Sequence, residues 1–295
     1  MSSATWPIPD WLTELSTDAW SHGPALGTVE RIDDAARARA IDAVTEFKAV
    51  TIGRPLVIDE STMLGSWSME KSLRSDGNYT SAYDHFEIDS HGLGITHLDA
   101  LNHFGVDRQW YQGKSADSED GVSLGELAML PIVTRCIFLD LAEARGKQFI
   151  DRNEPVGAAD LDRALEIAGT TIEPGDALLL YMGRDEFESA GGYLKPILDS
   201  PEGRPGVGES GSQWIGNTKA SLVAWDLNDA HGSGELRLSV HLLSWAIGLL
   251  LIDNCDFSAL RHAIGRKKQR TGLLTVCPLK IRGATGCAVN PVVMV

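Results

Sequence analysis

The sequence predicts one main α/β or α+β domain. Strand-like segments rich in β-branched and aliphatic residues alternate with helical segments along the whole chain. The 295 residues, 43% of them hydrophobic, are enough to bury one large core. No internal repeat is visible, and the Gly-rich stretch 203–217 lies inside the series of strands. We therefore expect that stretch to be a surface loop near a site and not a linker between domains.

The first fifty residues are interpreted as an N-terminal arm and helix (1–50) that precede the main domain (51–295). Residues 1–30 contain several prolines together with Trp6, Trp11 and Trp20. Because exposed tryptophans are unfavourable, we expect a loop-like arm that packs on the body or on a second subunit. From Asp33 to Val50, apolar residues recur at three-residue steps after an aspartate cap, and this pattern predicts a helix carrying Ile41, Val44 and Phe47 on one face.

The remaining elements follow from local composition. Segments rich in β-branched and aliphatic residues predict strands at Pro55–Ile58, Ile132–Leu141, Ala177–Met182, Leu222–Leu227, Leu249–Asp253, Leu273–Ile281 and Val289–Val295. Helical patterns intervene at Ala158–Ala168 and Leu236–Ile247.

Charge and composition restrict the partners. The balance of 26 basic against 41 acidic residues gives −15, which would repel a phosphate backbone, and the basic run Arg266–Arg270 fits a solvated loop. No stretch approaches the ~20 apolar residues that a membrane span needs, and the N-terminus lacks a secretory pattern. The cysteines Cys136, Cys255, Cys277 and Cys287 form no CxxC pair, which favours buried free thiols. We expect a cytoplasmic protein that binds neither nucleic acid nor membrane.

Residues 91–104, HGLGITHLDALNHF, concentrate three of the eight histidines of the chain. In an extended segment His97 and Asp99 share a face and can converge on one ion. If a helical turn begins at Asp99, His103 shares its face, while Leu98 and Leu101 point into the core. Structural histidines are common and HxD occurs by chance, so this segment alone leaves a metal site and an ordinary histidine-rich corner both open.

A second segment, VHLLSWAIGLLLIDNCDF at residues 240–257, places His241 near the start of an apolar helical stretch. Asp253 closes an apolar strand. An ionisable residue at that position is either a structural cap or a functional group at a strand terminus, and taken alone Asp253 fits the cap better.

Together the two segments resemble the cyclase family of metal-dependent hydrolases, which includes kynurenine formamidase and isatin hydrolase. THLDALNH (96–103) is similar to the T-H-x-D-x-P-x-H part of the family motif, with Leu101 in place of proline. His241 and Asp253 are twelve residues apart, as are the later His and Glu of the family. IEPGDALLLYMGR (172–184) and PLKIRGATGCAVNPV (278–292) resemble two further family stretches. The likeness covers about residues 50–295.

Two departures from the family pattern affect the expected metal site. Leu93 stands where the family has its first metal-binding histidine, and His91 lies six residues before His97. We therefore expect His91 beside the site and not in it. Asp253 replaces the family's glutamate and shortens that side chain by one methylene. Both changes favour one ion over two.

The resemblance implies a single domain with a mixed, barrel-like sheet flanked by helices, which associates as a homodimer or homotetramer. Carried over residue by residue, it makes His97, Asp99, His241 and Asp253 the ligands of Zn²⁺ or Mn²⁺. It makes His103 the general acid/base. The implied reaction is hydrolysis of a small-molecule amide, cyclic amide or lactone by metal-activated water. Two alternatives are a cyclase or dehydratase, and a non-catalytic binding protein descended from such hydrolases.

The substrate pocket is less well defined by the sequence. Phe104 and Trp110 follow the motif and are candidates for an aromatic pocket, although aromatic residues near a site often serve packing alone. Trp67 is a weaker candidate. Arg184 is a candidate for binding a substrate carboxylate, and a surface ion pair is its alternative.

Overall fold

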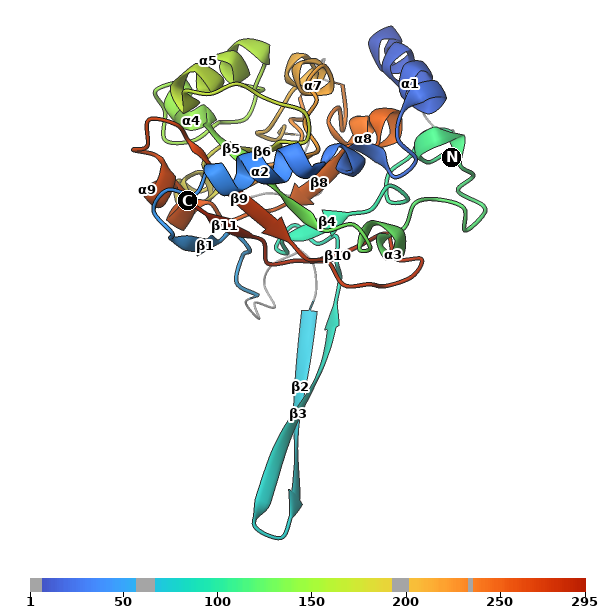
Figure 1. Cartoon of the computed structure of the whole chain (residues 1–295), viewed down its shortest axis with the longest axis vertical. Coiled ribbons are helices and arrows are strands. Elements are labelled where there is room, and N and C mark those ends of the chain that lie inside the picture. Colours follow the sequence, from blue (N-terminus) through green and yellow to red (C-terminus); the bar gives the residue numbers. More distant parts are fainter. Residues whose placement is uncertain (1–6, 57–66, 193–201, 233–235) are drawn as a thin grey trace.

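A computed structural model describes residues 7–56, 67–192, 202–232 and 236–295. Within these residues a mixed nine-stranded half-barrel sheet and surrounding helices form the body (Figure 1), which confirms the expected fold class. The strand order is β1-β11-β9-β5-β6-β7-β8-β4-β10. The strands are β1 (Ala49–Thr51), β4 (His97–Asp99), β5 (Ile132–Asp140), β6 (Ala177–Tyr181), β7 (Leu222–Trp225), β8 (Leu250–Asp253), β9 (Thr271–Val276), β10 (Gly286–Ala288) and β11 (Val292–Met294).

The centre of the sheet is parallel, from β5 through β6 and β7 to β8, whereas the pairs on both flanks are antiparallel. The central strands are buried on both faces, as parallel sheets usually are. Along β6, Leu179 packs into one hydrophobic cluster and its neighbours Leu178 and Leu180 pack into the other. The sheet therefore separates two cores, and each face is covered.

The helices pack around this sheet. They are α1 (Asp10–His22), η1 (Gly27–Arg31), α2 (Asp34–Asp42), η2 (Tyr111–Gly113), α3 (Leu124–Leu127), α4 (Leu141–Ala144), α5 (Ala158–Ala168), α6 (Arg184–Ser189), α7 (Glu209–Gly216), α8 (His241–Ile247) and α9 (Ser258–Ile264). The bounds of α5 are those predicted. None of the helices in the described residues has the length and apolar character needed to span a membrane.

The N-terminal arm is helical, so the loop expected over residues 1–30 is wrong for its described part. Helix α1 begins directly after Pro9, which acts as the N-cap residue, and it packs against α8. The indole Nε1 of Trp20 donates to the carbonyl of Trp245 over 3.2 Å, and that of Trp11 donates to Glu209 over 2.9 Å. The tryptophans therefore attach the arm to its own body, which was the first of the two expected possibilities.

Two other predicted segments differ from the structure. The helix predicted from Asp33 to Val50 ends at Asp42, and Phe47, which has a positive φ of 55°, is 81% exposed instead of facing the core. The Gly-rich stretch 203–217 is largely buried and contains α7, so the prediction of a surface loop is wrong. Its glycines permit close backbone packing: a Cβ on Gly206 would lie 2.0 Å from the carbonyl oxygen of Asn228.

Smaller corrections concern element ends and surface assignments. Strand β9 ends at Val276, before a proline that cannot donate to the ladder, and helix α8 begins at His241 instead of residue 236. The strand predicted at 55–58 is absent from its described residues 55–56, and residues 57–58 lie outside the described part. Cys277 is exposed, unlike the other three cysteines, and Arg270 of the basic run is buried and paired with Glu143.

A long β-hairpin projects from the body and was not predicted (Figure 1). Strands β2 (Trp67–Asp76) and β3 (Tyr79–Ile88) pair over ten residues each and form a separate two-stranded sheet. Gly77 and Asn78 form the two-residue turn at the tip, and Gly77 adopts φ 59°, the positive φ that favours glycine at the first central position of a hairpin turn. Most of the hairpin is exposed, so its residues do not show the burial pattern on which strand prediction depends.

Candidate metal centre

The two sequence motifs meet through strand pairing. Strand β4 lies between β8 and β10, and the register places His97 opposite Asp253. As predicted, the backbone from His97 to Asp99 is extended, so their side chains share a face while Leu98 is fully buried on the other. The helical turn considered after Asp99 is a single hydrogen-bonded turn, in which the amide of His103 donates to the carbonyl of Ala100 over 3.0 Å.

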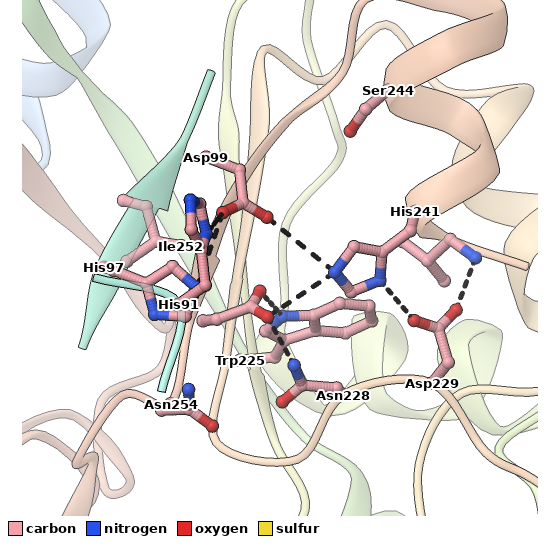
Figure 2. A network of polar contacts seen from close by, with 12 residues as sticks. His91, His97, Asp99, Trp225, Asn228, Asp229, His241, Ser244, Ile252 and Asn254 are labelled. Carbon is pink, nitrogen blue, oxygen red and sulfur yellow. Dashed lines mark hydrogen bonds and ion pairs between the residues drawn. The ribbon is translucent and has the colours of Figure 1, made fainter. Parts of the chain in front are cut away.

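All four predicted metal ligands are brought together (Figure 2). Nε2 of His97 lies 3.4 Å from Oδ1 of Asp99. Nε2 of His241 lies 3.7 Å from Oδ2 of Asp99 and 3.6 Å from Oδ2 of Asp253. Two groups of possible ligand atoms, each within 4.8 Å of one another, result: His91 with His97 and Asp99, and Asp99 with His241 and Asp253. Asp99 belongs to both groups, so it links them.

His91 belongs to this cluster, contrary to the expectation that it lies beside the site. Its Nδ1 is 3.0 Å from Oδ1 of Asp99, and its Nε2 is 3.0 Å from the hydroxyl of Thr285. Two consecutive hydrogen-bonded turns between Asp89 and Ile95 shorten the path of the backbone. His91 therefore reaches the site although it lies six residues before His97. Gly286 permits the approach, since a Cβ there would lie 2.7 Å from the His91 ring.

Hydrogen bonds orient two of the imidazoles toward the cluster centre. Nδ1 of His241 is 2.5 Å from Oδ2 of Asp229, and Nδ1 of His97 is 2.8 Å from the carbonyl oxygen of Ile95. Because both partners are acceptors, each Nδ1 donates its proton, so Nε2 is the nitrogen that carries the lone pair in the neutral imidazole. This is the arrangement in which histidines that bind metals are usually held.

Residues after β7 support the carboxylate of Asp253. The indole Nε1 of Trp225 donates to one oxygen over 2.5 Å, and the amide of Asn228 donates to the other. Together with Asp229, these residues were missed by the sequence analysis. A signal was present, because the polar residues Asp226, Asn228 and Asp229 directly follow a buried parallel strand, and sites form at the carboxyl ends of such strands.

Asn254 holds the His91 loop against β8. It has φ 58°, and its side-chain amide donates to the carbonyls of Gly92 and Ile95, each over 3.2 Å. Its Oδ1 accepts from Nη1 of Arg184 over 2.9 Å. Arg184 is 2% exposed and also pairs with Glu188, so it is a buried ion-pair partner and not a surface one. These contacts occupy the guanidinium and favour a supporting role over substrate binding.

The charges of the cluster suit a cation. Asp99, Asp229 and Asp253 are all buried, and Oδ2 of Asp99 has no hydrogen-bond partner among the described residues. Burial alone would raise the pKa of Asp99, but the hydrogen bond from His91 and the neighbouring histidines hold it well below its ordinary value. Likewise, burial would lower the pKa of His241, but Asp229 raises it well above its ordinary value. An orphaned carboxylate oxygen among imidazole nitrogens fits a divalent ion held by N and O ligands.

The remaining predicted site residues lie at different distances from the cluster. The half-buried ring of His103 stacks on His91, with 3.7 Å between centroids and 6° between planes, and burial lowers its pKa. Phe104 packs edge-on to His241 at 5.7 Å. Trp110 packs on glycines of its own loop, and Trp67 begins the hairpin strand β2. The structure thus brings His103 and Phe104 to the cluster, whereas Trp110 belongs to a loop and Trp67 to the hairpin.

We expect Asp229→Asn to weaken metal binding about 10- to 100-fold, because an amide orients and polarises His241 less well than a carboxylate. The dissociation constant of Zn²⁺ would be measured by competition with a chromophoric chelator. Asp151→Asn, an exposed change of the same chemistry, serves as the control. An affinity within twofold of the unmodified protein would contradict the orienting role of Asp229.

Comparisons with known proteins agree with this architecture. The family model described as "Putative cyclase" matches residues 13–230, so the match begins inside the N-terminal segment. A crystal structure described as a novel cyclase is 20% identical, covers 99% of this chain and 100% of its own, and superposes with a TM-score of 0.81. Isatin hydrolase A from Labrenzia aggregata is 16% identical over 87% of this chain and 95% of its own, with a TM-score of 0.57.

A predicted metal-dependent hydrolase from Bacillus stearothermophilus is 14% identical over 83% of this chain and 97% of its own, with a TM-score of 0.51. At these identities the solved structures establish the likeness of the fold. No curated protein matches the chain.

Proposed function

Because this chain belongs to the cyclase family, we propose that it is a metal-dependent hydrolase of a small-molecule amide, cyclic amide or lactone. The observation that carries the proposal is the buried cluster of three histidines and two aspartates in which Oδ2 of Asp99 has no partner among the described residues. Such a group is costly to bury unless a ligand completes it.

The metal would be held by His97, Asp99, His241 and Asp253, with His91 as a further donor in place of the histidine that Leu93 replaces. Zn²⁺ and Mn²⁺ both accept this mixture of nitrogen and oxygen ligands. We retain one ion per chain as the preferred state, because Asp253 is one methylene shorter than the glutamate of the family motif. Asp99, which is common to both groups of ligand atoms, fits a single ion or a bridged pair equally well. A divalent ion in this position supplies Lewis acidity, which polarises a carbonyl group and makes water a stronger nucleophile near neutral pH.

His103 would act as the general acid/base. Its ring stacks on His91 at the edge of the cluster and makes no hydrogen bond to the carboxylates of the described residues, so its nitrogens remain available for a proton. Burial favours the neutral imidazole, which is the form that accepts a proton from water. The same group would then return the proton to the leaving nitrogen or oxygen. Phe104, against His241, would form part of the substrate pocket.

A substrate panel tests this function. Lactones, formamides and isatin-like cyclic amides would be incubated with protein loaded with Zn²⁺ or Mn²⁺ and with chelator-treated protein, and the products identified by mass spectrometry. We expect a metal-dependent gain of about 18 mass units for lactones and cyclic amides, whose rings open, and a metal-dependent loss of about 28 mass units for formamides, which release formate. Cyclised or dehydrated products would favour the cyclase or dehydratase alternative, and binding without turnover of any compound would favour a non-catalytic protein.

We also propose that the chain associates with a second copy through the β2–β3 hairpin. Along one face of the hairpin the register places exposed Met69 opposite Phe86 and Leu73 opposite Ala82. A two-stranded hairpin is at best marginally stable in water, so this apolar face needs a cover. Between the two apolar pairs lies Lys71 opposite Asp84. A twofold axis parallel to the strands, between two such faces, would set each lysine against the aspartate of the other copy, Met69 against Phe86 and Leu73 against Ala82. The face is therefore complementary to itself.

Leu73→Asp should dissociate the assembly, because it buries a charge in this contact. The molar mass, measured by light scattering after size exclusion, should fall to the 31.9 kDa of one chain. Ser72→Asp adds the same charge to the opposite face of the same strand and should leave the mass unchanged. Unmodified protein that already elutes as one chain, or a Leu73→Asp variant that keeps its mass, would refute the hairpin contact.

A further inference from the structure

One buried cation near the candidate metal centre has no role in the function proposed above. Arg204 lies in the Gly-rich stretch and is 5% exposed. Its Nε and Nη2 are buried and have no hydrogen-bond partner among the described residues. A buried guanidinium with two unsatisfied nitrogens is unfavourable, so its retention calls for an explanation.

The backbone places Arg204 beside the residues that orient the metal ligands. Its amide donates to the carbonyl of His231 over 2.7 Å, and the amide of His231 donates back over 3.1 Å. Three residues on, Val207 bridges to Asp229, which holds His241. The segment 204–207 therefore runs along 228–231 and is fixed by main-chain hydrogen bonds.

The neighbouring carboxylates do not satisfy this guanidinium. The oxygens of Asp229 accept from the amide of Val240 and from His241, and those of Asp253 accept from Trp225 and Asn228. Both aspartates nevertheless act electrostatically on Arg204: burial lowers its pKa, and their charges oppose that change. The charges of the ligand cluster therefore act on the guanidinium, while its Nε and Nη2 remain available to donate to another anion.

We infer that Arg204 binds a carboxylate group of the substrate, so that the enzyme acts on small carboxylic acids whose scissile amide or lactone lies at the metal. The reaction in this inference rests on the proposed function, whereas the recognition of the substrate carboxylate rests on Arg204 alone. The fork of a guanidinium pairs with the two oxygens of a carboxylate, and such charge-assisted hydrogen bonds are strong and directional. Arg184, the sequence-based candidate for this task, is already occupied by Glu188 and Asn254.

Binding of phenylacetate, compared with its neutral counterpart phenylacetamide, tests this assignment by isothermal titration calorimetry. Both compounds would be titrated into Zn²⁺-loaded and chelator-treated protein. We expect phenylacetate to bind at least 10-fold more tightly than phenylacetamide in both forms. Arg204→Met should remove that preference, a loss of about 10- to 100-fold for the carboxylate alone, and Arg204→Lys should retain part of it. Arg163→Met, which removes an exposed positive charge on α5, should change neither affinity.

The outcomes separate this inference from the proposed reaction. A carboxylate preference that persists after metal removal and disappears in Arg204→Met supports the anion site even if no member of the substrate panel is hydrolysed. Equal affinities of the two compounds in unmodified protein overturn it, and this comparison needs no variant to fold. It is also overturned if phenylacetate binds only through Zn²⁺, with the same affinity in Arg204→Met, or if neither compound binds at millimolar concentration.

Discussion

Asp99→Asn should abolish metal binding, since Asp99 is the only residue common to both groups of ligand atoms among the described residues. An amide oxygen is a far weaker ligand than a carboxylate, and it carries no charge to balance the cation. Elemental analysis after reconstitution with Zn²⁺ or Mn²⁺ should give about one ion per unmodified chain and none for Asp99→Asn. Two ions per unmodified chain would mean that His91 completes a second position.

Thermal unfolding distinguishes this loss from misfolding. A metal at 100 times its dissociation constant stabilises the folded state by about 2.7 kcal/mol, which is a shift of roughly 5 °C or more in Tm. Unmodified protein and an Asp42→Asn control, changed at an exposed position, should both show this shift. Without metal, Asp99→Asn should be less stable than unmodified protein, because it loses the charged contacts with His91 and the neighbouring histidines that hold the pKa of Asp99 below its ordinary value. The readout is therefore the shift that metal adds to each protein, measured against the same protein without metal. A normal metal content or a normal metal-dependent shift in Asp99→Asn would contradict the site.

His103→Ala should lose turnover by about 10²- to 10⁴-fold in kcat while the metal content stays that of unmodified protein. We expect the metal content to be unchanged because His103 contacts His91 by ring stacking and belongs to neither group of ligand atoms. Steady-state kinetics on the best compound of the substrate panel and elemental analysis of the same samples measure the two quantities. His262→Ala, an exposed histidine on α9, should change neither. If His103→Ala loses the metal, His103 is a ligand and its acid/base role is wrong.

Local spacing predicted that His97 and Asp99 lie on one face, whereas the set of four ligands came from the resemblance to the cyclase family. His97 and Asp99 share a face because they are two residues apart in a strand, and this follows from backbone geometry alone. The partners Trp225, Asn228 and Asp229 could not be found in this way. Their contacts with Asp253 and His241 depend on which strands lie side by side, and neither β7–β8 pairing nor the β4–β8 register is encoded in a short window.

The errors have similar physical causes. His91 was placed beside the site on the assumption of a regular backbone, whereas consecutive turns bring it 3.0 Å from Asp99. The segment 203–217 was read as a surface loop because glycine is common in loops, but here glycine allows two backbones to pack closely. The parallel strands β5 to β8 were predicted well, since their continuous apolar runs reflect burial on both faces.

The pairing of His97 with Asp253 also fixes when the centre can form during synthesis of the protein. Ligand residues on β4 leave the ribosome about 150 residues before those on β8, as their positions in the chain require. Until α8 and β8 emerge, the ligand residues of the nascent chain are limited to the imidazoles of the first motif and Asp99, while β4 has neither of its neighbours in the sheet. Acquisition of the proposed ion would therefore be a late step, coupled to docking of the C-terminal strands, and we expect a prematurely terminated chain that lacks β8 not to retain it.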